Sequence, residues 1–395
     1  MVRRRSLIYV DRERLMPGYV PSFLPHRENQ LRLLSSFYMA ALENIEGAYL
    51  RPVQMVGGSG MGKTCCAKWF GSHIQEEAEK RKIDLRHVYM NCELEAPSRF
   101  VFYFNLLNKV SSDIATRGVS PEEMLRLLIE HLRRERKYLL ISVDDVDYFC
   151  RRSKEHLIYD LTRLSELHPG EPCPVIGVVF TAKDLSFHKR LDPSEVSTLG
   201  RCIIDFPTYS SEQIRDILER RVEEAFQPGV VSEQLLEFLS DITAEDFKGD
   251  VRVALDMLLC AGNIAENLGC EQVLPEHLRQ VYAKTYPWIT TVEIASLSHA
   301  SKLILLGVAQ ELSSSSYPYI SFSRIRENYH MVCESYEVKP VEEEAFEEHV
   351  QDLVNRGILR MKSLLKFGIS DAPAEELSRF LDDLIKRLKG ELDEA

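Results

Sequence analysis

A glycine-rich turn between an apolar run and a helix-forming stretch constrains this chain more than any other part of it. Residues 57–64 read Gly-Gly-Ser-Gly-Met-Gly-Lys-Thr, the run 53–56 before them is mostly apolar, and 65–79 after them has helical character. The pattern G-x-x-x-x-G-K-[ST] between a strand and a helix is that of a phosphate-binding loop. Glycine predominates because backbone N–H groups turn toward a phosphate only where side chains leave room. The sequence therefore predicts a nucleoside-triphosphate site.

The parts of this loop have separate expected roles. The N-terminus of the following helix adds partial positive charge where a β-phosphate would lie. Lys63 is expected to neutralise phosphate oxygens, and the Thr64 hydroxyl to ligate Mg²⁺. The residues expected to contact the nucleotide here are Gly58, Ser59, Gly60, Met61, Gly62, Lys63, Thr64 and Cys65. A chance glycine-rich turn is the alternative, and the flanking strand and helix argue against it.

A second apolar run, at 138–143, ends in two acids, Asp144 and Asp145. Such a run suits a buried parallel strand, and the carboxyl ends of parallel strands lie beside bound phosphates. Asp144 is expected to hold the Mg²⁺ together with Thr64, and Asp145 to polarise the attacking water. With Lys63 these acids form the predicted catalytic set. Two acids that merely begin a helix are the alternative interpretation.

Strands alternate with helices through the first half of the chain, which predicts a parallel five-stranded α/β sheet covered by helices on both faces. Strands are expected at 53–57, 86–91, 138–143, 175–181 and 202–205. Helices are expected at 26–42, 65–79, 98–115, 121–136 and 154–167.

The second half reads as two helical modules. Helices are expected at 211–226, 232–243, 251–267 and 275–285, then, after a linker at 285–290, at 299–312, 322–336, 342–355 and 373–388. Between the last two, residues 356–369 alternate apolar and basic side chains, as in a β-hairpin with one solvated face. Three helices followed by a hairpin predict a winged helix-turn-helix, a common nucleic-acid-binding module.

Composition limits the class of protein. A length of 395 residues suits two or three domains, and contents of 45% apolar and 28% charged residues are those of a soluble globular protein. No apolar run is long enough for a membrane span, and no apolar signal core follows the basic start, so a cytoplasmic protein without membrane partners is expected. A net charge of -12 argues against a globally basic nucleic-acid binder but permits a local basic patch. Nine cysteines without a C-x-x-C pair give no zinc or redox motif.

Taken together, these motifs resemble the archaeal AAA+ replication initiators, a family related to the eukaryotic origin recognition complex and its loading partner. The resemblance extends from about residue 19 to about residue 366. It is carried by YVP at 19–21, LPHRE at 24–28, the loop at 57–64, VDDVD at 143–147, LDP at 191–193, DFPTYS at 205–210 and GDVRVA at 249–254.

The resemblance implies an AAA+ nucleotide-binding core at 1–208, a helical lid at 209–288 and a winged-helix DNA-binding domain at 289–395. It implies ATP or ADP with Mg²⁺ as the cofactors, and adenine enclosed by the segment 19–28. The residues of this segment implied to bind the nucleotide are Tyr19, Val20, Leu24, Pro25 and Arg27, and Tyr209 is implied to bind it as well. Arg252 matches the sensor arginine of the lid, whose guanidinium can grip two phosphate oxygens.

Three departures from the family pattern bear on hydrolysis. Asp145 stands where the family usually has glutamate, and the sensor asparagine expected after the fourth strand is missing, with Phe-Thr-Ala-Lys at 180–183 in its place. Ser194 follows the LDP motif where many members have an arginine that acts on a neighbour's nucleotide. We therefore expect slow ATP hydrolysis that serves as a switch.

The family contacts DNA through an insertion helix, here near 98–114, and through the winged helix. The helix expected to enter the major groove carries Glu342, Glu343, Glu344, Glu347 and Glu348, which would repel phosphates. DNA contacts are therefore predicted on the hairpin and the preceding helix. The candidates are Arg360, Lys362, Lys366, Arg324 and Arg326. Ordinary solvated surface charges are the alternative for each.

Three functions are weighed. The first is an initiator that binds double-stranded origin DNA and, with other initiator subunits, recruits or loads the replicative helicase. The second is a signalling or transcription-regulating P-loop ATPase that acts through protein partners, which would explain the acidic helix. The third, a small-molecule kinase, gives no reason for a lid followed by a winged helix.

Overall fold

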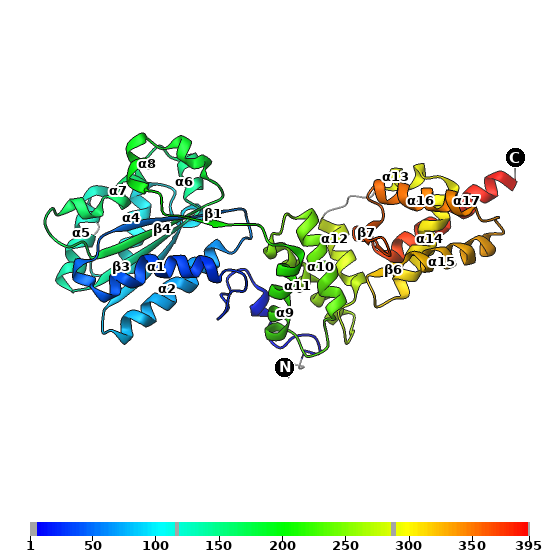
Figure 1. Ribbon diagram of the computed structural model, residues 1–395, viewed down its shortest axis with the longest axis horizontal. Coiled ribbons are helices and arrows are strands. Elements are labelled where there is room, and N and C mark those ends of the chain that lie inside the picture. Colours follow the sequence, from blue (N-terminus) through cyan, green and yellow to red (C-terminus); the bar gives the residue numbers. More distant parts are fainter. Residues whose placement is uncertain (1–5, 115–117, 286–289, 394–395) are drawn as a thin grey trace. The chain divides into compact units, whose positions relative to one another are not determined.

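The computed structural model describes residues 6–114, 118–285 and 290–393 (Figure 1). They form two compact units: Val20–Thr208, and the remainder, in which Met1–Tyr19 joins Tyr209–Ala395. Among the described residues, no helix is both long enough and apolar enough to cross a bilayer.

The unit Val20–Thr208 is built on five parallel strands in the order β2-β3-β4-β1-β5. The strands are β1 Arg51–Gly57, β2 Leu85–Asn91, β3 Tyr138–Asp144, β4 Val175–Ala182 and β5 Ile203–Phe206. All eight residues of β4 are buried, as expected for an apolar strand in the middle of a covered sheet. The predicted parallel five-stranded sheet is confirmed.

Helices cover both faces of this sheet; in Figure 1, α1 and α2 lie on one side of it and α6 and α8 on the other. The helices are α1 Glu28–Glu43, α2 Lys63–Lys80, α3 Cys92–Glu95, α4 Arg99–Val110, α5 Pro121–Arg134, α6 Val146–Arg152, α7 Leu157–Thr162 and α8 Pro193–Leu199. Short 3₁₀ turns are η2 Ile45–Gly47, η3 Leu164–Leu167 and η4 Leu185–Arg190. An apolar core fills the space between the sheet, α4, α5 and α7.

Two predicted helices of this unit are shorter in the structure. The stretch 154–167 is divided into α7 and η3, because Arg163 leaves helical geometry between them. The stretch 98–115 ends at Val110, because Ser111 is extended and its N–H closes the last turn on Leu107. Residue 115 lies outside the described residues.

The other unit begins with η1 Arg12–Leu15 and continues with four lid helices. These are α9 Ser211–Ala225, α10 Glu233–Asp246, α11 Val251–Asn267 and α12 Pro275–Thr285. Ser210 and Ser232 cap α9 and α10 as the sequence predicts, each accepting a backbone N–H with its hydroxyl. The predicted linker at 285–290 falls mainly on 286–289, outside the described residues.

The winged helix follows, with its own apolar core. Its elements are α13 Thr291–Ser296, α14 His299–Ser314, β6 Tyr319–Ser321, α15 Phe322–Tyr336, α16 Glu343–Asn355, β7 Arg360–Ser363, β8 Lys366–Gly368 and α17 Ala374–Asp393. The predicted hairpin is confirmed as β7–β8, residues 360–368, which we call the wing. The strand β6 adds a third antiparallel strand, in the order β6-β8-β7. Sequence analysis missed β6 because three residues carry too little alternation to be recognised.

Candidate nucleotide and nucleic-acid sites

The loop after β1 has the conformation that a phosphate-binding loop requires. Gly60 and Gly62 have φ of 72° and 86°, a left-handed backbone that residues with a Cβ rarely adopt. Gly62 is also the N-cap of α2 and has no side chain to occupy the helix end. The first N–H groups of α2 therefore lie at the open side of the loop, where an anion is favoured.

Lys63, the first residue of α2, is buried and reaches back over the loop. Its Nζ donates to the carbonyl oxygens of Gly57 and Gly58, at 2.6 and 2.7 Å. The ammonium group is thus held at the loop by neutral acceptors. Phosphate oxygens bind an ammonium group more strongly than carbonyls do, because their hydrogen bonds are charge-assisted.

The two predicted metal ligands are in direct contact. Thr64 donates its hydroxyl hydrogen to Oδ2 of Asp144, with 2.7 Å between the oxygens. Adjacent ligands of an octahedral Mg²⁺ are about 3 Å apart, because each metal–oxygen bond is about 2.1 Å. The two side chains therefore fit Mg²⁺: Thr64 and Asp144 would hold the ion, which would supply positive charge to nucleotide phosphates.

Asp144 is buried and receives two further hydroxyl groups, from Tyr89 and Thr181. Thr181 lies in β4. Its hydroxyl also accepts the backbone N–H of Asp145 at 3.0 Å. Thr181 therefore connects both acids to the central strand.

Asp145 follows β3 with φ of 54° and begins α6. The side-chain amide of Asn91 donates to its carboxylate at 3.3 Å. Burial and the neighbouring charge of Asp144 raise the pKa of Asp145. Tyr89 and Asn91 were not among the predicted site residues. Their signal was available in their place at the carboxyl end of β2, where Asn91 pairs in register with Asp144.

Arg27 is hydrogen-bonded to the phosphate-binding loop. The side chain is almost fully buried, and Nε donates to the Met61 carbonyl while Nη1 and Nη2 donate to those of His26 and Pro207, each at 2.9 Å. It therefore ties the phosphate-binding loop to the end of β5. Of the other residues predicted to enclose adenine, Leu24 is buried, and Val20 and Pro25 are half-buried.

Tyr19, Tyr209 and Arg252 belong to the other unit. The guanidinium groups of Arg14 and Arg221 each lie over the Tyr19 ring, with the guanidinium carbon 4.7 Å from the ring centre. Tyr209 is buried. The Arg252 side chain is 59% exposed and pairs with Asp250, the N-cap of α11, at 3.3 Å. The predicted roles of these three side chains at the nucleotide stay predictions.

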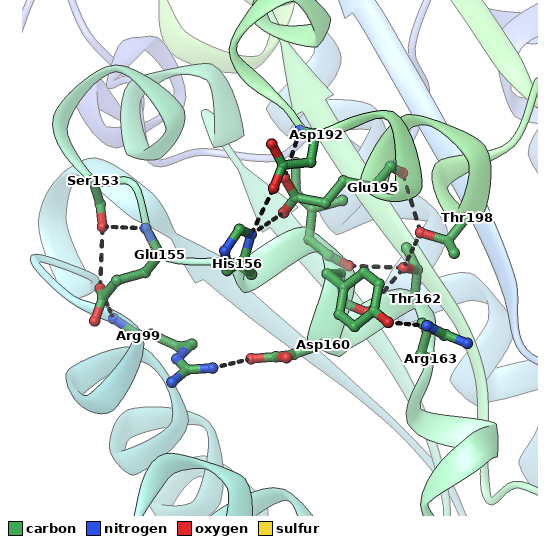
Figure 2. Close-up of polar contacts among 12 residues, drawn as sticks. Arg99, Ser153, Glu155, His156, Asp160, Thr162, Arg163, Asp192, Glu195 and Thr198 are labelled. Carbon is green, nitrogen blue, oxygen red and sulfur yellow. Dashed lines mark hydrogen bonds and ion pairs between the residues drawn. The ribbon is translucent and has the colours of Figure 1, made fainter.

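A second polar network surrounds the starts of α7 and α8 (Figure 2). His156 Nδ1 lies 3.5 Å from Glu195 and 3.8 Å from Asp192. The Glu195 carboxylate also accepts the backbone N–H of Asp192 at 3.0 Å, which completes a capping box on α8. We attribute this cluster to helix capping.

A neighbouring set of polar contacts holds the first residue of α4, the helix that the resemblance places at DNA. The backbone N–H of Arg99 donates to Glu155, and its guanidinium pairs with Asp160, both at 2.8 Å (Figure 2). A further ion pair joins Arg99 to Glu122 on α5. Arg99 therefore anchors α4 to its own unit.

Four of the five side chains predicted to bind DNA form ion pairs with carboxylates. Arg324 pairs with Glu311 and Glu327, and Arg326 with Glu343. Arg360 pairs with Glu245 and Asp246 of the lid helix α10. Lys362 pairs with Glu237 and Asp241 of the same helix. Lys366 is exposed and forms no ion pair within the described residues. The glutamates of α16 are exposed, as the sequence indicates.

Comparison with known proteins gives matches along most of the chain. Residues 52–191 match the AAA domain, 215–283 the Cdc6 AAA+ ATPase-type lid domain, and 292–366 the CDC6 C-terminal winged helix domain. The ORC1-type DNA replication protein of Desulfurococcus amylolyticus is 30% identical over 339 residues, which cover 83% of each chain.

Solved structures are similar over nearly the full length. The crystal structure of Cdc6p from Pyrobaculum aerophilum has a TM-score of 0.78 and 28% identity, covering 96% of this chain and 99% of that one. The Aeropyrum pernix ORC1 protein in complex with DNA has a TM-score of 0.64 and 28% identity, covering 98% and 100%. The Aeropyrum pernix ORC2 protein, described in ADPNP-ADP complexes, has a TM-score of 0.64 and 25% identity, covering 97% and 100%.

Proposed function

Because the chain belongs to the archaeal Orc1/Cdc6 family of AAA+ ATPases with a C-terminal winged helix, we propose that it is a DNA replication initiator. It binds double-stranded origin DNA and, with other initiator subunits, helps recruit or load the replicative helicase. ATP and ADP act as a slow conformational switch. The proposal is supported by a relative named ORC1-type DNA replication protein and by the similarity to an ORC1 protein solved in complex with DNA.

The contact between Thr64 and Asp144 carries the nucleotide half of the proposal. It brings two side-chain oxygens together near Lys63 and the amino end of α2, which supports a site for Mg²⁺ and nucleotide there. Bound Mg²⁺ would neutralise charge on the β- and γ-phosphates. Lys63 then contacts phosphate oxygens, and Arg27 keeps the loop in the shape that receives them.

Hydrolysis is slow because the water-polarising acid is poorly placed. Asp145 is one methylene shorter than glutamate, and the Asn91 amide already occupies part of its carboxylate. The nucleotide therefore stays bound for long periods, and its state sets the arrangement of the protein.

DNA binding rests on the winged helix. Lys366 in β8 is the exposed cation of the wing, and it takes a phosphate contact. Arg324, Arg326, Arg360 and Lys362 take phosphates only by exchanging a carboxylate partner. Because phosphate contacts carry no base information, this surface positions the protein on a duplex more than it selects a sequence.

One observation favours a different function. The exposed glutamates of α16 occupy the helix that would enter the major groove, and Glu343 also pairs with Arg326. Such a face suits a basic protein partner better than a phosphate backbone. On this alternative, the chain is a signalling or transcription-regulating ATPase that acts through protein contacts.

Two measurements test the proposal. Mass spectrometry of gently purified protein should find retained adenine nucleotide, and an empty site would contradict tight binding. Footprinting on DNA that contains candidate origins should then give discrete protection. Uniform weak protection, or none, would support the alternative.

A further inference from the structure

The wing carries two cations on one side of a strand, facing a row of acids on a lid helix. Arg360 and Lys362 are two positions apart in β7, so their side chains leave the same face. Glu237, Asp241 and Glu245 are spaced four apart in α10, so they share one face of that helix. Each cation meets two carboxylates. The partners are Glu245 and Asp246 for Arg360, and Glu237 and Asp241 for Lys362.

Both cations are largely withdrawn from solvent. Their side chains are 15% and 21% exposed, and the distances from Lys362 Nζ to Glu237 and Asp241 are 2.6 and 2.7 Å. Burial alone would lower the pKa of Arg360, but the charges of Asp246 and Glu245 outweigh it and raise that pKa. The guanidinium therefore keeps its charge and is neutralised in place.

Tyrosine hydroxyls orient the two aspartates, which are less exposed than the two glutamates. Tyr319 in β6 donates to Asp241, and Tyr282 in α12 donates to Asp246, each at 3.0 Å. These carboxylates are thereby oriented toward the wing independently of its cations. Carboxylates that lie near a cation by chance would not also be held by tyrosine hydroxyls. An exposed ion pair without such hydrogen bonds contributes little to stability.

The wing is also joined to the lid by a contact that does not involve these acids. Arg279 in α12 is fully buried, and its guanidinium donates to the carbonyls of Ile369 at 2.8 Å and Pro318 at 3.2 Å. The wing sheet therefore stays attached to α12 when Arg360 or Lys362 changes partner. Exchange of a carboxylate for a phosphate needs only side-chain movement. The Glu245 side chain is 62% exposed, so solvent already reaches this ion pair.

We propose that the acidic face of α10 is an autoinhibitory surface: its four carboxylates compete with DNA phosphates for Arg360 and Lys362 and so reduce the affinity of the wing for a duplex. This inference rests on the proposed function, because it assumes that the wing binds DNA. It adds that the lid sets how many wing cations are available. With Arg360 and Lys362 paired to the lid, Lys366 is the wing cation that is available to a DNA phosphate.

The test is a four-residue neutralisation in the full chain. The variant carries Glu237→Gln, Asp241→Asn, Glu245→Gln and Asp246→Asn, and its Asn side chains still accept the two tyrosine hydroxyls. The control carries Glu212→Gln, Glu223→Gln, Glu233→Gln and Glu271→Gln, four exposed lid acids that form no ion pair with the wing within the described residues. Both proteins gain the same net charge, so long-range attraction to DNA is matched.

Binding to a fluorescent 30-base-pair duplex is measured by anisotropy over a range of salt concentrations. We expect the variant to bind at least about tenfold more tightly than the control near 0.1 M salt. The slope of log affinity against log salt should steepen by about 1.8, roughly 0.9 for each freed cation. Adding Arg360→Ala and Lys362→Ala to the variant should remove both gains.

The outcomes separate the two proposals. If wild type and control bind DNA and the variant binds no better than the control, α10 is not autoinhibitory, and the proposed function stands. A gain that survives Arg360→Ala and Lys362→Ala would also overturn the inference, because it would not depend on the wing cations. If no protein of the set binds duplex DNA at low salt, the proposed function fails and the inference fails with it.

Discussion

Thr64 donates its hydroxyl hydrogen to a carboxylate oxygen of Asp144, 2.7 Å away, although the two residues are 80 positions apart in the chain. The contact joins the first turn of α2 to the end of β3. It forms because parallel strands deliver their carboxyl ends to one edge of the sheet, where the loop after β1 also lies. The predictions about nucleotide chemistry follow from this pairing.

Changing Asp144 to asparagine should remove the Mg²⁺ dependence of nucleotide binding. An amide oxygen is a weak ligand for Mg²⁺ and lacks the negative charge that attracts it. We expect ATP to bind wild type at least about tenfold more tightly with Mg²⁺ than with EDTA, and the variant about equally in both, measured by calorimetry. An undiminished Mg²⁺ effect in the variant would remove Asp144 from the metal site.

Changing Asp145 to glutamate should speed ATP hydrolysis, because the longer side chain brings the carboxylate closer to the attacking water. Asp145→Asn should slow it by about 10²-fold or more, as expected when a general base is lost. Phosphate release under single-turnover conditions measures both. Equal rates for aspartate, glutamate and asparagine would show that this position does not act on water.

Arg27→Ala should destabilise the unit 20–208 and weaken nucleotide binding together. The change leaves three backbone carbonyls without a charged donor, which we expect to cost about 3 kcal/mol in urea unfolding. Arg32→Ala is the matched control, since Arg32 is an exposed cation on α1. Its effect should stay within about 0.5 kcal/mol. Equal effects of the two variants would mean that Arg27 does not hold the loop.

Asp371→Asn should stabilise the protein at neutral pH and have no effect in acid. Burial raises the pKa of the Asp371 carboxyl to about 6, above the ordinary value near 3.8, although Arg360 opposes the shift. The folded state therefore holds a proton more tightly than the unfolded state, and ionising the group above pH 6 costs stability. That cost approaches about 3 kcal/mol by pH 8 and vanishes as the pH falls to about 4.

Thermal unfolding of wild type and Asp371→Asn between pH 4 and pH 8 measures this difference. Asp383 on α17 is exposed, so Asp383→Asn provides a control with the same change of charge. Its effect should vary little with pH. A constant difference between Asp371→Asn and wild type across the range would contradict a buried, proton-binding carboxyl.

Features of the candidate nucleotide site that are encoded by a few consecutive residues could be predicted from the sequence. The loop at 57–64, the acids after β3 and the helix caps at Ser210 and Ser232 are each encoded by a few consecutive residues. For this reason the loop, the five-stranded sheet and the winged helix could be read from the sequence. The end of α4 at Val110 and the division at Arg163 could not, because neither has a helix-breaking residue to mark it.

The side chains that complete the site come from distant segments. Tyr89 and Asn91 reach the two acids only because β2 pairs with β3, and a list of apolar runs does not give strand order. The same limit applies to the wing. Arg360 and Lys362 read as solvated cations in a hairpin, and nothing near them in sequence indicates that α10 supplies their partners.

The most direct measurement compares DNA binding by wild type and Lys63→Ala in ATP, in ADP and without added nucleotide. Lys63→Ala should lose bound nucleotide, while the winged helix, which has its own core, stays folded by circular dichroism. We expect wild type to change its affinity for duplex DNA between ATP and ADP, and Lys63→Ala to show one affinity in all conditions. Wild type and Lys63→Ala binding DNA identically, with no adenine nucleotide retained by either, would contradict the proposal that a nucleotide in this loop governs how the wing meets DNA.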